Sequence, residues 1–228
     1  MKTKVLIFDF DDTLGCRETY CYRTFSEILD KVSPGLDPWE REMILQQIMI
    51  YDQHGTVPRS YIREKLLNKF GIEIGEDIQE VWNASQWRNT VLYSDTRKVL
   101  EELKRRGYRL AVLTNGSVEG QSGKLKKSGL LDLLEEVLIS CETSYKKPDP
   151  RIFWQLTDWM EVEPQECAYI GDLFRNDIYG AHKAGIRPIW FWPHGHREIS
   201  IEVERISSLS ELLDLFPMID SMDEEEEV

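Results

Sequence analysis

The sequence predicts an α/β protein, a doubly wound parallel sheet that carries an inserted, all-helical second unit. After residue 90, short apolar runs alternate with amphipathic helical segments, which is typical of parallel strands joined by crossover helices. Residues 17–90 have helical spacing and few strand signals. The length of 228 residues, at about 150 residues per domain, fits one core with a sizeable insertion.

The first half of the chain begins with a strand and continues with helices. Residues 4–8, KVLIF, are a short apolar run with β-branched residues, as expected of a strand buried on both faces. This strand ends at Asp9. Glycine and proline residues separate the helical segments that follow, which are expected at 18–32, 38–53, 58–69 and 77–89. We therefore expect a helical cap domain at 17–90.

Strands and helices alternate in the second half. Gly107 ends one helix, and Pro150 suits the first position of another, with Asp149 as its N-cap. The expected strands are 108–116, 136–140, 166–172 and 187–192, and the expected helices are 96–107, 118–128, 150–160, 176–185 and 209–216. The core domain is predicted at 1–16 and 91–217, followed by a disordered acidic tail at 218–228.

The chain is acidic, with 28 Lys and Arg against 41 Asp and Glu and a net charge of −13. Such a surface argues against a nucleic acid polymer or an anionic membrane as partner. No apolar run reaches the roughly 18 residues of a membrane span, and no signal-peptide pattern is present. The 4 cysteines lack a CxxC spacing, which indicates free thiols in a reducing compartment. A cytoplasmic location is expected.

Chemistry-bearing residues follow several predicted strands. Asp9 and Asp11 follow the first strand, and their i, i+2 spacing lets both carboxylates face one pocket. Thr114-Asn115-Gly116 ends the second strand, and Lys146 and Lys147 follow the third. Asp172 ends the fourth, with Asp177 five residues on. Because ligands of such sheets bind beyond the carboxyl ends of the strands, these groups are expected to converge.

This set of groups points to phosphoryl transfer. Crowded carboxylates repel one another unless a cation intervenes, and Mg²⁺ is the natural partner of Asp9 and Asp172. The Thr114 hydroxyl and the backbone N–H groups of the Thr114–Gly116 turn can bind an anion's oxygens. Lys147 supplies a point charge for the same anion. In phosphoryl transfer, positioning and charge neutralisation are the main catalytic contributions.

Taken in order, FDFDDTL, LTNG, KKPDP and GDLFRND resemble the four motifs of the haloacid dehalogenase-like (HAD) superfamily. The resemblance covers about 1–14 and 91–195. A single motif is short, but all four in order at the expected strand ends are highly specific. A helical insertion after the first motif resembles the cap of the phosphoglycolate phosphatase and 5′-nucleotidase-like branch. The resemblance implies a Rossmann-like core.

The resemblance also implies roles for the acidic residues. Asp9 would be the nucleophile that forms an aspartyl-phosphate. Asp11 would protonate the leaving oxygen and then activate water, and its backbone carbonyl would bind Mg²⁺. Asp172 would bind Mg²⁺, and Asp177 would support that metal site, through water or through Lys147.

The phosphoryl group would be held by Thr114, Asn115 and the turn at Gly116. Lys147, which directly precedes the proline of its motif, would offset charge on Asp9 and on the phosphate. Asp12 stands where many members of the superfamily have glycine, and it is interpreted as a turn residue.

The predicted function is therefore Mg²⁺-dependent hydrolysis of a small phosphorylated metabolite by a monomer or a homodimer. Dehalogenases of the same fold lack the second aspartate of the first motif, so Asp11 favours phosphate chemistry. Phosphomutases keep both aspartates and stay an alternative. A phospho-receiver module would be near half this length and without the insertion. A non-catalytic binding protein is disfavoured because every expected catalytic residue is present.

Overall fold

The computed structural model describes residues 2–219. Apart from Met218 and Ile219, the predicted disordered tail at 218–228 lies outside the described residues. The described chain divides into two compact units. One contains the sheet, and the other takes in Gly15–Val91 together with Ser117–Gly129.

The first unit is built on a parallel sheet, and this confirms the predicted α/β class. In the described part of the chain the sheet has six strands in the order β3-β2-β1-β4-β5-β6, and every neighbouring pair is parallel. The strands are β1 Val5–Phe8, β2 Arg109–Thr114, β3 Glu136–Ile139, β4 Cys167–Gly171, β5 Arg187–Phe191 and β6 Glu204–Ile206. The order reverses direction at β1, so the switch point of the fold lies between β1 and β4.

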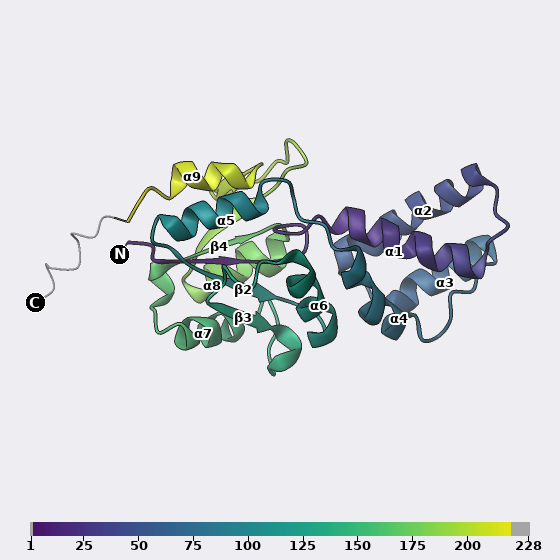
Figure 1. The fold of residues 1–228 in the computed structure, drawn as a ribbon, viewed down its shortest axis with the longest axis horizontal. Helices are drawn as coiled ribbons and strands as arrows, with labels where there is room; N and C mark the ends of the chain where they lie inside the picture. The colour runs from purple at the N-terminus through teal and green to yellow at the C-terminus, as the bar shows by residue number, and fades with distance from the viewer. Residues whose placement is uncertain (1, 220–228) are drawn as a thin grey trace, which may run out of the picture. The chain divides into compact units, whose positions relative to one another are not determined.

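Helices cover both faces of this sheet. The helices α5 (Thr96–Arg105) and α9 (Leu212–Leu215) lie on one face, and α7 (Pro150–Trp159) and α8 (Tyr179–Ala184) lie on the other (Figure 1). On the second face, Ile7, Leu113 and Tyr169 of the strands pack with Phe153 and Leu156 of α7. The Asp149 side chain accepts from the Arg151 N–H at 3.0 Å, which confirms it as the N-cap of α7.

Three local features differ from the sequence-based expectation. The edge strand β6 was not predicted, because it has three residues and its Glu204 and Arg205 are exposed. The segment expected as a helix at 176–185 begins earlier, with a π-helical turn at Phe174–Ile178. The last helix begins as a 3-10 turn at Leu209–Glu211.

The second unit is helical. It contains α1 Arg17–Val32, α2 Pro38–Asp52, α3 Arg59–Phe70, α4 Ile78–Ser85 and α6 Val118–Ser128. The structure groups α6 with this unit, whereas the sequence placed 118–128 in the α/β core. The reason is a close contact, since a Cβ at Gly123 would lie 2.5 Å from Trp87 Cγ. At the core of this unit, the rings of Phe25 and Trp82 lie 4.8 Å apart.

A charged cluster is also buried in the helical unit. The Asp52 carboxylate accepts hydrogen bonds from Arg17 and from Arg59, and all three residues are buried. The Arg59 guanidinium lies over the Trp82 ring, 4.4 Å from its centroid. Burial by itself raises the pKa of Asp52, but the two arginines outweigh it and hold that pKa at about 2.

Candidate active site

The carboxyl ends of β1 and β4 bring two aspartates to the switch point of the sheet. Asp9 directly follows β1, and its N–H donates to the Ile170 carbonyl of β4 at 2.9 Å. Asp172 directly follows β4, and the Trp190 indole N–H of β5 donates to its backbone carbonyl at 2.8 Å. Both aspartate side chains are buried. The parallel register of β1 and β4 therefore fixes the backbone of both residues at the same edge.

Lys147 links Asp9 to Asp177. Its Nζ lies 2.9 Å from Asp9 Oδ1 and 2.7 Å from Asp177 Oδ1. Burial opposes the charge on Lys147, but Asp177 and Asp9 outweigh it and raise the pKa of the lysine. The neighbouring Lys146 is exposed. Of the two lysines that the sequence offered, the structure brings Lys147 to the aspartates.

Asn115 holds the loop that carries Lys147. Its Nδ2 donates to the Lys147 carbonyl, and its Oδ1 accepts from the Lys147 N–H, both at 3.0 Å. The Gly116 N–H donates to Ser140 Oγ at 3.1 Å, so this donor is not free for an anion as the turn had predicted. Thr114 is buried at the end of β2. The Asn115 side chain thus anchors the lysine loop, a contact that the sequence did not indicate.

Asp177 is fully buried, and a glycine makes room for it. Its Oδ2 accepts from the Leu173 N–H at 2.9 Å, within the same turn. A Cβ at Gly171 would lie 2.5 Å from Asp177 Cγ, a distance that real Cβ atoms do not tolerate. Both oxygens of Asp177 already accept hydrogen bonds, from Leu173 and from Lys147. Asp177 thus holds the Lys147 ammonium beside Asp9.

The carboxylates form a cluster that suits a cation. Single oxygens of Asp9, Asp172 and Asp177 lie within 4.8 Å of one another. Burial raises the pKa of Asp9 to about 7, with Lys147 opposing and Asp177 and Asp11 adding to the rise. Burial also raises the pKa of Asp172 well above its usual range, and Asp177 and Asp9 add to it. A bound cation would favour the ionised form of both carboxylates and so oppose these shifts.

The donor set fits Mg²⁺. The Asp172 Oδ1 is buried and has no hydrogen-bond partner within residues 2–219. A desolvated carboxylate oxygen without a donor is costly unless a cation satisfies it. Carboxylate oxygens are also the ligands that Mg²⁺ prefers. Asp172 and Asp9 would therefore hold the ion directly.

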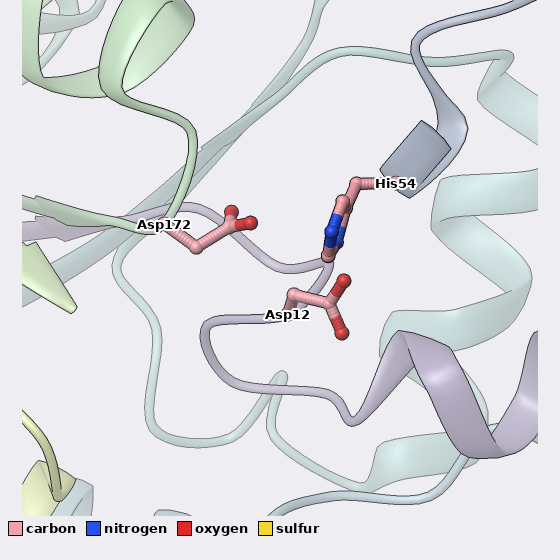
Figure 2. Close-up of side chains that lie close together, drawn as sticks. All are labelled: Asp12, His54 and Asp172. Carbon is pink, nitrogen blue, oxygen red and sulfur yellow. The ribbon is translucent and has the colours of Figure 1, made fainter. Parts of the chain in front are cut away.

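Asp12 also lies close to Asp172, although the sequence indicated only a turn residue. Its φ of 53° lies in the left-handed region, as the turn interpretation requires. Its side chain is buried, and one of its oxygens lies within 4.8 Å of one of Asp172. Figure 2 shows the carboxylates of Asp12 and Asp172 at the site, and it also labels His54, an exposed residue of the helical unit. A third acid directly after Asp9 and Asp11 was the signal that could have identified it.

Tyr169 of β4 is a second residue that the sequence did not indicate. Its hydroxyl lies 2.7 Å from Lys147 Nζ and donates to the Leu113 carbonyl at 2.8 Å. Burial, together with Asp177 and Asp9, raises the pKa of this phenol well above its usual range, so it stays neutral. In the sequence, a tyrosine within a strand looks like an ordinary core residue. Only the folded structure brings its hydroxyl to Lys147.

Among the described residues, no helix is long and apolar enough to cross a membrane.

Comparison with known proteins gives a consistent picture. The chain is 33% identical over 134 residues to a glyceraldehyde 3-phosphate phosphatase of Pyrococcus furiosus, covering 57% of this chain and 56% of the relative. It is 42% identical over 103 residues to a phosphoserine phosphatase of Thermus thermophilus, covering 45% and 41%. The matched segments thus span about half the length of these relatives. A solved HAD phosphatase from Thermococcus onnurineus superposes with a TM-score of 0.68 at 27% identity, covering 96% of this chain and 99% of that one.

The family itself follows from a longer match. The sequence profile of the haloacid dehalogenase-like hydrolases matches residues 6–191, which include all four motifs and the helical insertion. The parallel sheet, with acidic residues at the carboxyl ends of β1 and β4, agrees with that match. This chain belongs to the haloacid dehalogenase-like hydrolase family.

Proposed function

We propose that this chain is a Mg²⁺-dependent phosphatase that hydrolyses a small phosphomonoester through an aspartyl-phosphate on Asp9. The observation that carries the proposal is the buried site at the switch point of the sheet. There Lys147 bridges Asp9 and Asp177, and Asp172 presents a carboxylate oxygen with no hydrogen-bond partner in the described chain. The names of the relatives support the same class of substrate.

In the first proposed step, Asp9 attacks phosphorus. A bond forms between an Asp9 carboxylate oxygen and phosphorus while the bond from phosphorus to the ester oxygen breaks. Asp11 donates a proton to that leaving oxygen. In the second step, Asp11 takes a proton from water, and the water oxygen attacks the same phosphorus. Inorganic phosphate leaves, and the Asp9 carboxylate is restored.

The other residues stabilise charge and keep the reacting groups in position during these steps. Lys147 favours the ionised form of the Asp9 carboxylate against the effect of burial, and it would offset charge on the phosphoryl group. The Thr114 hydroxyl would bind a phosphoryl oxygen, while the Asn115 side chain keeps the lysine loop in place. Asp9 and Asp172 would hold Mg²⁺, which would supply further positive charge for the phosphoryl oxygens.

The helical insertion at 17–90 is proposed as the cap domain. The support for this is its place in the chain, directly after the first motif, and its own compact core. The two named relatives act on different phosphomonoesters, so the substrate is proposed only as a small phosphorylated metabolite. A cytoplasmic monomer or homodimer without a nucleic acid or membrane partner completes the proposal. Its four free cysteines are typical of a reducing compartment.

Hydrolysis of p-nitrophenyl phosphate with Mg²⁺, followed by a panel of phosphorylated metabolites ranked by kcat/KM, tests the proposal. Asp9→Asn is expected to abolish turnover, and unchanged activity in that variant would refute the mechanism. Lys147→Met and Lys146→Met are a matched pair, because only the first lysine is buried at the site. A loss of activity confined to Lys147→Met is expected. A requirement for a bisphosphate activator would reveal a mutase, and metal-independent attack on haloacids would reveal a dehalogenase.

A further inference from the structure

Tyr169 completes the set of acceptors around the Lys147 ammonium. Lysine has three N–H donors and no acceptor. Three oxygens lie within hydrogen-bonding distance of Nζ, namely Asp9 Oδ1 at 2.9 Å, Asp177 Oδ1 at 2.7 Å and the Tyr169 hydroxyl at 2.7 Å. The contacts with Asp177 and Tyr169 are hydrogen bonds, and the contact with Asp9 is an ion pair. Two of the three oxygens belong to carboxylates, and the third is neutral.

The main chain of the sheet fixes the Tyr169 hydroxyl. It accepts from Lys147, so its own single proton is left to donate, and the Leu113 carbonyl at 2.8 Å is nearer than Asp177 Oδ1 at 3.3 Å. Leu113 lies in β2, next to Thr114. The hydroxyl is thus hydrogen-bonded to the backbone of a strand, which is more rigid than a side chain would be.

Packing also fixes the aromatic ring. Tyr169 is fully buried, pairs with Ile7 of β1 in the sheet register, and meets the Phe153 ring edge-on at a centroid distance of 5.2 Å. The ring and the hydroxyl therefore form a rigid support beneath Lys147. Without that support, two carboxylates would leave the ammonium free to pivot about the line between them.

We propose that Tyr169 is a positioning residue that aims the Lys147 ammonium at Asp9 by accepting a hydrogen bond from it. The role rests on the proposed phosphatase function, because it acts on the step in which Asp9 attacks phosphorus. The structural observation on which it rests is independent of the substrate: the ammonium is hydrogen-bonded to Tyr169 and Asp177 and lies 2.9 Å from Asp9 Oδ1.

Tyr169→Phe removes the acceptor and keeps the ring. The matched control is Tyr108→Phe, because Tyr108 is also buried and its hydroxyl donates to a backbone carbonyl, that of Pro217 at 3.0 Å. With p-nitrophenyl phosphate and Mg²⁺, we expect kcat of Tyr169→Phe to fall roughly tenfold, with KM within about twofold of wild type. Tyr108→Phe should keep the wild-type kcat.

The outcomes separate the two proposals. An inactive wild-type protein would overturn the phosphatase proposal. An active wild type with an equally active Tyr169→Phe variant would overturn the positioning role. A variant that melts earlier but keeps its kcat would show that the hydroxyl is only structural, and would overturn the positioning role too.

A second measurement needs no activity. The ¹⁵N NMR signal of the Lys147 ammonium, assigned by its loss in Lys147→Met, reports how fast its protons exchange with water. We expect a slowly exchanging signal in wild type and in Tyr108→Phe, and at least roughly fivefold faster exchange in Tyr169→Phe, because one N–H has lost its acceptor. Equal exchange in all three proteins would overturn the proposal.

Discussion

The space between Gly171 and Asp177 sets the position of the lysine that pairs with Asp9. In Gly171→Ala, the new Cβ would lie 2.5 Å from both Cβ and Cγ of Asp177. Carbon atoms in contact prefer about 3.5–4.0 Å, so one side must move by about 1 Å. Asp177 cannot simply rotate away, because its two oxygens hold Leu173 and Lys147.

Two effects of this substitution can be measured. Overpacking of a buried site costs about 1–3 kcal/mol of unfolding free energy. In a protein of this size that lowers the melting temperature by roughly 2–12 °C. A displacement of about 1 Å at a catalytic charge lowers kcat by up to roughly 100-fold. Thermal unfolding followed by circular dichroism, and kcat for p-nitrophenyl phosphate with Mg²⁺, report the two effects.

Gly35→Ala is the control for this experiment. A Cβ at Gly35 has nothing within 4 Å, and its backbone does not require glycine. Its melting temperature and kcat should therefore match wild type. Wild-type values in Gly171→Ala as well would refute the reasoning, since they would mean that Asp177 can shift without cost to the fold or to Lys147.

Three further predictions concern aspartate residues. The pKa of Asp52 is held at about 2 by Arg17 and Arg59, so its stabilising effect is present above the unfolded-state value near 4 and is lost as pH falls towards 2. We expect the free energy of unfolding to fall by about 2 kcal/mol over this acid range in wild type but not in Asp52→Asn. Urea unfolding at each pH measures it. Asp12→Gly removes a side chain from a left-handed backbone and should stabilise the metal-free protein by about 1 kcal/mol, whereas an unchanged urea midpoint would contradict this. Mg²⁺ at 100 times its Kd should raise the free energy of unfolding of wild type by about 2.7 kcal/mol, and that of Asp172→Asn by much less. Equal shifts in melting temperature for the two proteins would exclude Asp172 as a ligand.

The sequence predicted the elements that carry the site because strand and helix signals are local. Asp9 and Asp172 end buried apolar runs, and parallel strands place their carboxyl ends at one edge. The choice of Lys147 over Lys146 came from the resemblance of its motif to the family pattern. The short strand β6 escaped prediction because an exposed three-residue edge carries little apolar signal.

Other contacts could not be read from the sequence because they join distant residues through the sheet register. Asn115 and Lys147 are 32 positions apart, yet two hydrogen bonds connect the Asn115 side chain to the backbone of Lys147. The Gly116 N–H is likewise taken by Ser140 rather than left for an anion. Local spacing shows which residues reach the edge of the sheet, but not which of their donors are already used.

The sequence by itself determined the fold class, the order of the motifs and the acidic groups that collect at the strand ends. These properties depend on local hydrophobic patterning and on residue types. Only the tertiary structure decided how charge is distributed within the site. The Tyr169 support beneath Lys147, the space that Gly171 leaves for Asp177, and the unpartnered oxygen of Asp172 in the described chain all arise where β4 packs between its neighbours. Each depends on contacts between side chains that meet across the sheet, which no local pattern encodes.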